Sequence, residues 1–512
     1  MSSPATFLGG EPRSTRRPPA RHWTLIAVAL GTFMTYLDNN IINVAIPTIE
    51  RSLHLSQSGV EWVVSAYILV FASLLLAGGR LADLFGQKRL FMIGLSVFTA
   101  ASLIAGLVGQ VDLLIASRAL QGLGAALLTP TTLAILKTTY TDPREQARAV
   151  GAWSAVGAVA LAAGPLLGGV LSQHVDWHWI FFINVPVGLA TLWLGARVIA
   201  SSDVPIRRSI DTRGVAFSAG ALLTLTFALI EGPQIGWTAP SIVAALAATP
   251  LAVIAFVIAE RRAEDPMLDL SRVANRTFTG ATIALMIWAF GLFGIYFFTS
   301  LYLQRVLGFS ATTAGAAFVP MAVLMAFGAG ISDPVAARVG AHRLVSAAMG
   351  LMGLGIVSVS LLGAHATFGD LMPAFAMIGI GGGLTIPLTS TILGSLPDER
   401  AGVASAAFNA SREVAGLLGI TIIGVILRAG QTAALHHGQP PLTAFLSGYR
   451  LGLVVAGVLV CAGGVAAWVA LRDLPSSRKA AGEPLRVPSA RPRLRRRTDR
   501  CRRSQRDQPV AL

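Results

Sequence analysis

Apolar runs alternate with short, charged stretches along most of this 512-residue chain. Each run holds about twenty residues, which is the length of helix that crosses the hydrocarbon core of a bilayer. We predict fourteen membrane spans, at roughly 23–44, 60–79, 90–110, 113–136, 149–172, 179–200, 214–231, 239–259, 278–299, 312–331, 344–363, 371–393, 402–427 and 450–471. The pattern therefore predicts an all-α integral membrane protein.

The composition excludes a string of soluble domains. Hydrophobic residues make up 54% of the chain and charged residues 13%, whereas a soluble protein is about a quarter charged. The two cysteines, Cys461 in an apolar run and Cys501 in a charged stretch, do not suggest a disulfide framework. No spacing of cysteine and histidine indicates a metal site, so we expect no metal and no other cofactor.

Lysine and arginine mark one side of the predicted membrane. They concentrate in the loops that precede odd-numbered spans, and cytoplasmic loops are the ones enriched in these residues. The predicted outer loops hold only Arg51, Arg305, Arg428 and Arg450. We therefore expect both termini in the cytoplasm, in agreement with an even number of spans.

A basic tail, 472–512, follows the last span of a chain whose net charge is +15. Its low hydrophobicity and high charge predict disorder. A tail of this kind either marks the inner side or is attracted to anionic lipids of the inner leaflet. We expect the bilayer as its partner, and no nucleic acid.

One short motif occurs twice. Residues 78–90 read "GGRLADLFGQKRL" and residues 337–344 read "ARVGAHRL", so that Gly86 matches Gly340 at an offset of 254. Parallel repeats of six spans build one large class of transporters. We expect a cytoplasmic N-terminal segment, a six-helix bundle, two extra helices with their linkers, a second six-helix bundle and the tail, at 1–22, 23–200, 201–277, 278–471 and 472–512.

Six stretches in order resemble the major facilitator superfamily, and within it the fourteen-span drug:proton antiporters of bacteria. They are "LDNNIINVAIP" at 37–47, "GGRLADLFGQKRL" at 78–90, "RALQGLGAA" at 118–126, "GPLLGG" at 164–169, "WHWIFFINVPVG" at 177–188 and "YLQRVLGFSATTAG" at 302–315. Three departures stand out: Asn40 replaces threonine, Leu84 and Gln87 replace basic residues, and His178 replaces arginine. The resemblance implies the major facilitator fold, two six-helix bundles plus two extra helices.

Asp38 is the first candidate for a functional residue, since a charged side chain in the middle of a membrane costs on the order of 3 kcal/mol. One interpretation places it near the outer surface as a solvated helix-end residue. The other, favoured by the resemblance, places its carboxyl on a central cavity. There it would hold either a proton or a cationic substrate, and this exclusion is the simplest chemistry of antiport.

Three further charged residues within predicted spans are candidates. Arg118 stays protonated and needs a carboxylate, carbonyls or water; the resemblance links it to proton coupling, and whether it reaches Asp38 is open. Arg412 and Glu413 are adjacent, so their side chains leave a helix about 100° apart. We expect each to find a different partner near the inner interface, as a gate contact or a proton relay.

Two glycine-containing motifs are candidates for conformational change. In the first loop motif, Asp83 with Lys88 and Arg89 would form a compact charge cluster, a weak and reversible inner gate that also includes Gly79 and Gly86. Surface ion pairs contribute roughly 0 to 1 kcal/mol each. In the second motif, small residues allow close approach of helices, and the resemblance implies an antiporter seam at Gly164, Pro165, Gly168 and Gly169.

Aromatic residues are weaker candidates, because those at span ends often form interfacial belts. Of them we select Tyr67 and Tyr296 as possible cavity lining. No phosphate-binding G-x-x-x-x-G-K-[ST] loop is present in the sequence, so an ion gradient is the expected energy source. No serine, histidine and aspartate constellation suggests an enzyme.

The resemblance implies proton-driven export of hydrophobic or amphipathic small molecules, such as antibiotics, from a bacterial cell (inner) membrane. Export of one specific metabolite that the host makes is the alternative, with the same machinery. A proton-coupled uptake symporter is a third and less favoured function.

Overall fold

The structure is a computed structural model that describes residues 21–200, 211–263, 276–394 and 401–472. Within these residues all regular secondary structure is α-helical. The helices are α1 (Arg21–Leu53), α2 (Gln57–Phe85), α3 (Gln87–Leu107), α4 (Val111–Thr139), α5 (Pro143–His174), α6 (Trp179–Phe182), α7 (Asn184–Val198), α8 (Thr212–Ile235), α9 (Pro240–Arg262), α10 (Arg276–Arg305), α11 (Ala311–Val339), α12 (Ala341–Ser360), α13 (Phe368–Gly383), α14 (Ile386–Gly394), α15 (Ala401–His436) and α16 (Pro441–Leu471).

The described residues form fourteen helical segments that are long and apolar enough to cross a membrane. The prediction of a fourteen-span, all-α fold is confirmed. Two spans are broken helices, α6 with α7 and α13 with α14. Several helices are longer than the predicted spans, because a helix continues past the last apolar residue as long as its backbone hydrogen bonds are satisfied; α1 reaches Leu53 and α15 reaches His436.

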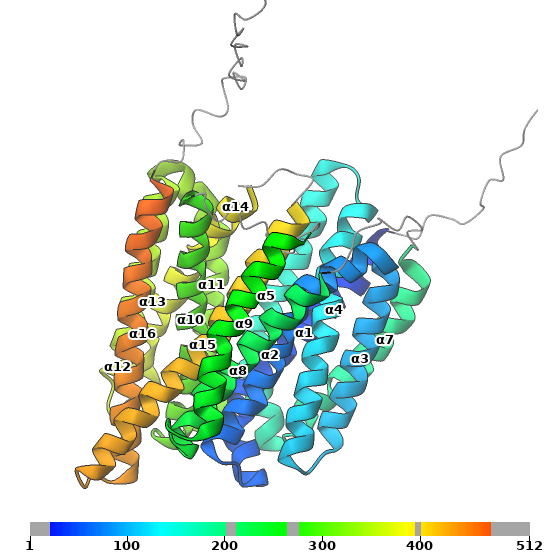
Figure 1. Cartoon of the computed structure of the whole chain (residues 1–512). Coiled ribbons are helices and arrows are strands. Elements are labelled where there is room, and N and C mark those ends of the chain that lie inside the picture. The colour runs from blue at the N-terminus through cyan, green and yellow to red at the C-terminus, as the bar shows by residue number, and fades with distance from the viewer. Residues whose placement is uncertain (1–20, 201–210, 264–275, 395–400, 473–512) are drawn as a thin grey trace, which may run out of the picture. The chain divides into compact units, whose positions relative to one another are not determined.

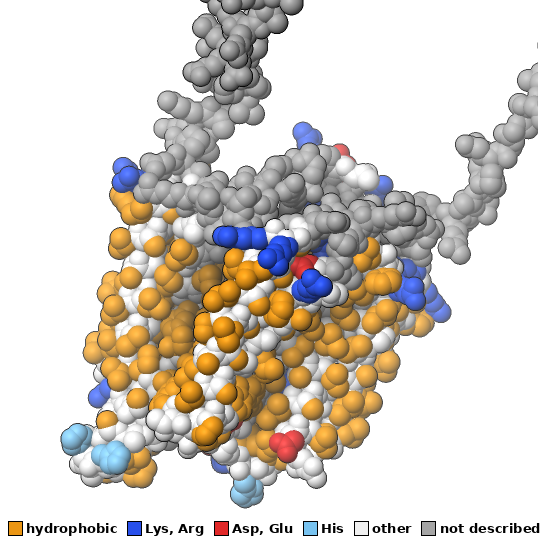
Figure 2. Space-filling model, viewed as in Figure 1, with side chains coloured by type: hydrophobic (Ala, Val, Ile, Leu, Met, Phe, Trp, Pro, Cys, Tyr) orange, Lys and Arg blue, Asp and Glu red, His pale blue; other side chains and the backbone are white. Residues whose placement is uncertain are grey.

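Helix α1 begins and α16 ends at the same end of the bundle (Figure 1). We call this the termini end, and the opposite end, where α1 gives way to α2, the far end. Figure 2 shows a broad hydrophobic surface between the two ends, with Lys and Arg side chains gathered at the termini end. Helices with such an apolar exterior suit a lipid environment.

The helices pack in two groups. Helices α1 to α7 pack mainly on one another, and so do α10 to α16. The two groups meet where α5 packs on α11, α2 on α15 and α1 on α10. Helix α9 packs on α8, which itself packs on α2 and α15. We call the groups the N-half and the C-half; the domain boundaries given above stay a prediction.

The internal repeat is visible in the backbone at the same offset of 254 residues. Gly86 and Gly340 both have φ 90° and ψ 137°, and each ends one helix and begins the next. Ser56 and Ser310 each accept a hydrogen bond from a backbone N–H three residues on, at 3.1 and 3.2 Å. Only glycine adopts the first conformation without strain, and serine is a favoured N-cap.

The packing repeats as well. A Cβ added to Gly122 of α4 or to Gly379 of α13 would lie 2.4 Å from a backbone oxygen, that of Tyr67 or that of Met321. Tyr67 and Met321 are again 254 residues apart. Helices α4 and α13 therefore occupy equivalent places in the two halves, with an offset of 257 residues between them.

Candidate functional site

Asp38 lies in the middle of α1 and is 1% exposed. Its Oδ2 accepts a hydrogen bond from Arg118 Nη1 at 2.5 Å, and its Oδ1 accepts one from Gln121 Nε2 at 2.8 Å and one from Asn184 Nδ2 at 2.9 Å. The open question of whether Arg118 reaches Asp38 is therefore answered. The carboxylate is neither solvated nor at a helix end.

Arg118 is completely buried in α4 and joins Asp38 to further helices. Its Nε donates to the Val63 carbonyl of α2 at 3.2 Å, and its guanidinium carbon lies 4.6 Å from the centre of the Tyr67 ring. Gln121 Nε2 also donates to Ser102 of α3 at 2.8 Å. The network thus connects α1, α2, α3, α4 and α7 within the N-half.

A cavity of about 100 Å³ lies between the halves, smaller than the roughly 300–1,000 Å³ of typical small-molecule sites. Helices α1, α2 and α5 line it from the N-half, and α10 and α15 from the C-half. The lining residues are Tyr36, Asn39, Asn40, Asn43, Val64, Ile68, Leu161, Trp288, Leu292, Phe293, Tyr296, Arg412, Glu413 and Ile420.

Asp38 is outside this lining, so the expectation that its carboxyl faces the central cavity is wrong for this conformation. The reason is helical periodicity: Tyr36 and Asn40 are each two residues from Asp38, and two residues turn the helix by about 200°. Tyr36, Asn39, Asn40 and Asn43 share the cavity face of α1. Asp38 points into the N-half instead.

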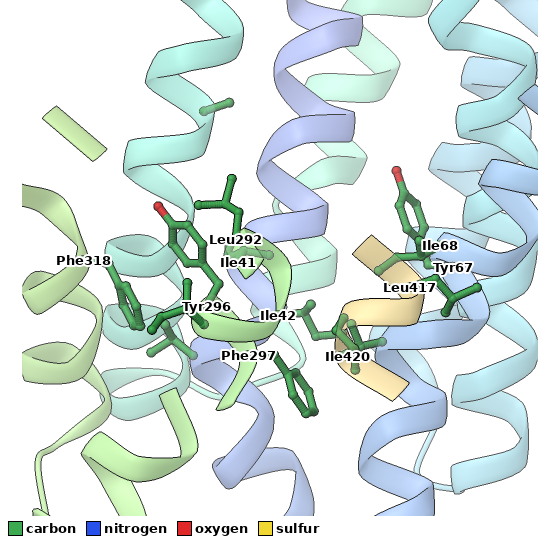
Figure 3. Packing of buried hydrophobic residues seen from close by; sticks show 14 of the residues in the cluster. Ile41, Ile42, Tyr67, Ile68, Leu292, Tyr296, Phe297, Phe318, Leu417 and Ile420 are labelled. Atoms are coloured by element: carbon green, nitrogen blue, oxygen red, sulfur yellow. The ribbon is translucent and has the colours of Figure 1, made fainter. Parts of the chain in front are cut away.

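The two tyrosines selected from the sequence, Tyr67 and Tyr296, differ in whether they line the cavity. Tyr296 lines the cavity, where its ring stacks on Phe318 at 5.1 Å. Tyr67 is 1% exposed and lies under Arg118, outside the cavity lining. Figure 3 shows Tyr296 beside Phe318 and Tyr67 apart from both. The expectation is met for Tyr296 and wrong for Tyr67.

Arg412 and Glu413 both line the cavity. Glu413 Oε1 accepts from Arg412 Nη2 at 2.7 Å and from Nε at 3.2 Å. The expectation of separate partners is therefore wrong, because the long arginine side chain folds back across the 100° between the two positions. The Arg412 guanidinium also lies 5.8 Å from the Tyr36 ring of the N-half. Glu413 is 1% exposed, so the pair lies inside the bundle rather than at the inner membrane interface.

A third buried ion pair, between Glu61 and Arg428, joins the halves towards the far end. Glu61 of α2 is fully buried and its Oε1 accepts from Arg428 Nη1 of α15 at 2.5 Å. The expectation that Arg428 lies in an outer loop is wrong, because α15 continues to His436. Glu61 was not among the expected site residues, although it is an acidic residue just inside an apolar run, as Asp38 is.

Other contacts also join the halves near the far end. Glu50 forms an ion pair with Arg305. Gln304 Nε2 donates to the Val44 carbonyl of α1 at 2.9 Å, and Thr312 N donates to Gln173 Oε1 at 2.9 Å. These contacts hold the N-half and C-half together at that end.

The four residues of the predicted seam lie where α5 meets other helices. A Cβ on Gly168 would lie 2.2 Å from the Ile41 oxygen of α1, and one on Gly169 would lie 2.2 Å from the Ala311 oxygen of α11. One on Gly164 would lie 2.6 Å from Asn40 Cβ. The carbonyl of Pro165 is equally close, 2.1 Å, to a Cβ on Gly315. The motif brings backbones of the two halves together, while its role in export stays a prediction.

The predicted inner gate loop lies between α2 and α3 at the termini end. Gly86 has the positive φ that the tight connection requires. Lys88 Nζ donates to the Ala196 carbonyl of α7 at 2.8 Å. Among the described residues Asp83 makes no ion pair with Lys88 or Arg89, so the expected charge cluster does not form in this conformation. Gly79 has only a Pro130 atom, 3.8 Å away, within 4 Å of an added Cβ.

The described residues contain no group of three or more His, Cys, Asp or Glu side chains that could hold a metal ion. What the site offers is two enclosed ion pairs, Asp38 with Arg118 and Arg412 with Glu413. Only the second faces the cavity. The arrangement places a carboxylate, aromatic rings and amides around one cavity between the halves.

Comparison with known proteins gives the family. The sequence model of the Major Facilitator Superfamily matches residues 28–420, well over half of the chain. The chain belongs to this superfamily. It is 34% identical over 493 residues to the puromycin resistance protein pur8 of Streptomyces alboniger, covering 93% of this chain and 96% of that protein. It is 38% identical over 411 residues to the methylenomycin A resistance protein of Bacillus subtilis, covering 80% of this chain and 88% of that protein.

Solved structures of low sequence identity share the major facilitator fold. A bacterial homolog of the human lysosomal transporter Spinster, in an inward-facing and unoccupied conformation, matches with a TM-score of 0.63 at 18% identity. The match covers 89% of this chain and 98% of that one. The family and the fourteen helices make this chain a multi-pass membrane transporter rather than an enzyme.

Proposed function

We propose that this major facilitator protein is a secondary active exporter that moves hydrophobic or amphipathic small molecules, such as antibiotics, outwards in exchange for protons. The observation that carries the proposal is the cavity between the halves, which contains a buried carboxylate, Glu413, beside aromatic and apolar side chains. Two relatives named for resistance to antibiotics support the same cargo class.

Glu413 is the group at which we place the exchange of proton for cargo. Its Oε1 is held by Arg412, while Oε2 is buried without a hydrogen-bond partner. A buried carboxylate oxygen in that condition is stabilised either by a proton or by a donor group of the cargo. These two occupants exclude each other, which is the requirement for antiport.

Asp38 acts behind the cavity in this proposal. Both of its carboxylate oxygens accept hydrogen bonds in the structure, Oδ2 from Arg118 and Oδ1 from Gln121. Neither oxygen is therefore available to bind a cargo. Its network holds Arg118 against Tyr67 of α2, the helix that also contributes Val64 and Ile68 to the cavity wall. Asp38 and Arg118 therefore position that wall.

The proton gradient is a sufficient energy source. If one net positive charge moves inwards in each cycle across about 150 mV, the potential supplies roughly 3.5 kcal/mol. That free energy supports a cargo gradient on the order of 300-fold. We propose that both termini are cytoplasmic in a bacterial inner membrane, in keeping with the Lys and Arg side chains at the termini end (Figure 2).

Alternating access then requires the far-end contacts to break. Glu61–Arg428 and Glu50–Arg305 close the bundle there, and both pairs join one half to the other. Rocking of the halves about the cavity would separate these pairs and open the far end. The proposed cycle loads the cargo from the termini end and releases it at the far end.

The test is transport into everted membrane vesicles from a host that lacks its own drug pumps. Ethidium, puromycin and 1,8-dihydroxyanthraquinone serve as probes, each with and without an uncoupler. We expect at least one probe to accumulate, the uncoupler to abolish this, and Glu413→Gln to abolish it at normal protein levels. Glu145→Gln, at an exposed carboxylate of the termini end, is the matched control and should transport normally.

Absence of uncoupler-sensitive transport for all three probes would contradict drug export. Accumulation of a single probe with exclusion of the others would favour the alternative, a transporter dedicated to one metabolite. Movement of the probes out of everted vesicles would indicate uptake by the cell.

A further inference from the structure

Three buried polar atoms that line the central cavity have no partner in the protein. They are Trp288 Nε1 and Tyr296 Oη of α10 and Glu413 Oε2 of α15. Tyr296 is 4% exposed and Glu413 is 1% exposed. Buried polar groups nearly always have a hydrogen-bond partner, and an orphan is costly. A shared position around one cavity indicates that the cargo supplies the partners.

The positions of these atoms define a pattern of recognition. Trp288 and Tyr296 are eight residues apart, so they lie on one side of α10 with about 12 Å of helix rise between them. Leu292 and Phe293 lie between them on the same wall. The α10 wall thus has two hydrogen-bonding groups separated by an apolar middle.

The opposite wall adds amides. Asn39, Asn40 and Asn43 line the cavity from α1. Asn40 Nδ2 donates to the Tyr36 carbonyl at 2.7 Å and Asn43 Nδ2 donates to the Asn39 carbonyl at 3.4 Å. Because the amide nitrogens of Asn40 and Asn43 are engaged by their own helix, their amide oxygens are left to accept hydrogen bonds from a cargo.

The cavity carries no net charge from the pair that faces it. Arg412 and Glu413 are ion-paired at 2.7 Å, and the Asp38–Arg118 pair behind α1 is also balanced. A permanent cation that entered the cavity would lose its hydration. The Glu413 carboxylate is already neutralised by Arg412, so no unpaired anion would compensate for the cost of removing the cation from water.

We infer that the preferred cargo is an uncharged, flat molecule with several hydroxyl and carbonyl groups around an aromatic body, rather than a lipophilic cation. Carbonyl oxygens of the cargo would accept a hydrogen bond from the Trp288 indole N–H, and its hydroxyl groups would donate to Glu413 and to the asparagine oxygens. The Tyr296 hydroxyl can donate to the cargo or accept from it. This inference rests on the proposed function, since it names the cargo class of the same cavity.

Equilibrium binding to the purified full-length protein in lipid nanodiscs tests it. The two probes are planar tricyclic molecules of similar size: 1,8-dihydroxyanthraquinone, which is uncharged with two hydroxyls and two carbonyls, and 10-methylacridinium, a permanent cation without such groups. We expect the anthraquinone to bind at least tenfold more tightly. We expect Trp288→Phe and Tyr296→Phe, which remove one polar atom each, to weaken it about 3- to 10-fold and to leave the acridinium unchanged.

Matched controls are Trp193→Phe and Tyr302→Phe. Trp193 is 58% exposed on the outside of the bundle, and the Tyr302 hydroxyl donates to the Gly363 carbonyl outside the cavity. Both should bind the anthraquinone as the unmodified protein does. Tighter binding of the cation, binding of neither probe, or unchanged anthraquinone binding by both cavity variants would overturn the inference. Export of cations alone would overturn it while leaving proton-driven export intact.

A separate observation concerns the two extra helices. Towards the far end, Glu231 Oε1 of α8 accepts from Trp62 Nε1 of the N-half at 2.8 Å. Two residues earlier in the same helix, the Leu229 carbonyl accepts a hydrogen bond from Arg428 Nη2 of the C-half at 3.2 Å. Arg428 itself is bonded to Glu61. Helix α8 therefore bonds both partners of the junction where α2 meets α15.

We infer that α8 is a clamp that stabilises the state in which the far end is closed. The test uses a single cysteine in place of Asn43, with Cys461 and Cys501 replaced by serine, and a membrane-impermeant maleimide added on the far side. We expect Glu231→Leu, which removes the acceptor of the Trp62 hydrogen bond, to raise the labelling rate about tenfold. Asp112→Leu, at an exposed far-end carboxylate of α4, is the matched control. An unchanged rate in Glu231→Leu would overturn the clamp.

Discussion

The two halves share a backbone plan and differ in what fills it. At the place of Asp38 in α1, the C-half has Leu292 in α10, 254 residues on. At the places of Arg118 and Gln121 in α4, it has Phe375 and Ile378 in α13, both fully buried, at the offset of 257. A hydrogen-bonded ion pair in one half thus corresponds to an apolar core in the other.

The apolar version indicates that the equivalent helices of the C-half pack without such charges. Phe375 stacks on Phe318 at 5.5 Å, and Phe318 stacks on Tyr296 of the cavity wall at 5.1 Å. Buried ion pairs are weak contributors to net stability, and apolar residues of similar size often replace them without loss. The retained pair in the N-half is therefore best explained by transport, while the C-half contributes the carboxylate that faces the cavity.

The largest effect is expected from breaking the N-half pair on one side. Arg118→Met leaves Asp38 buried without its cation, which should lower the free energy of unfolding by about 3–5 kcal/mol. Asp38→Leu combined with Arg118→Met, which imitates the C-half, should recover most of that loss and still fail to transport. Denaturant titration in detergent measures both. Equal destabilisation of the single and double variants would show that the charges are needed for folding.

At the repeated glycines we expect a smaller loss of the free energy of unfolding than for Arg118→Met, and the same loss in both halves. Gly122→Ala and Gly379→Ala each push a methyl group against a backbone oxygen 2.4 Å away, and overpacking of this kind costs about 1–3 kcal/mol. Gly151→Ala, where an added Cβ has nothing within 4 Å, is the control and should not destabilise. The same unfolding assay applies, and a loss confined to one half would refute the equivalence of α4 and α13.

The smallest effect is expected from trimming the apolar core of the C-half. Phe375→Leu should lower the free energy of unfolding by about 1–2 kcal/mol through the cavity it leaves. No buried charge loses its partner in this variant. Uncoupler-sensitive transport should persist, in contrast to the Arg118 variants. Complete loss of transport with unchanged stability would assign the C-half core a direct part in coupling.

The sequence predicts the fold well because lipid imposes simple rules. The number of spans follows from apolar length, and the repeated glycine of the loop motif predicts the equivalence of the halves. It misplaces Arg428 because the last turns of α15 continue beyond the apolar run, and charge alone does not distinguish a loop from a helix end. Glu61 carried the same signal as Asp38, an acidic residue inside an apolar run, but its partner Arg428 comes from a helix more than three hundred residues away, which the sequence does not reveal.

The site was predictable only in part. Three asparagines and Tyr36 lie at helical spacing on α1, so the position of Asp38 on the other side follows from periodicity once the cavity is known. Which side faces the cavity depends on how α1 rotates against α5 and α10, which the sequence leaves open. The Arg412–Glu413 pair depends on side-chain reach, which the angle between adjacent helical positions does not exclude.

The most direct test of the account asks which carboxylate couples protons to cargo. Proteoliposomes with Glu413→Gln are compared with the unmodified protein for 1,8-dihydroxyanthraquinone transport, first driven by an imposed proton gradient and then as exchange between labelled and unlabelled probe without a gradient. We expect Glu413→Gln to lose gradient-driven accumulation and to keep exchange. Gradient-driven accumulation by Glu413→Gln at the unmodified rate would contradict it and return the coupling role to Asp38.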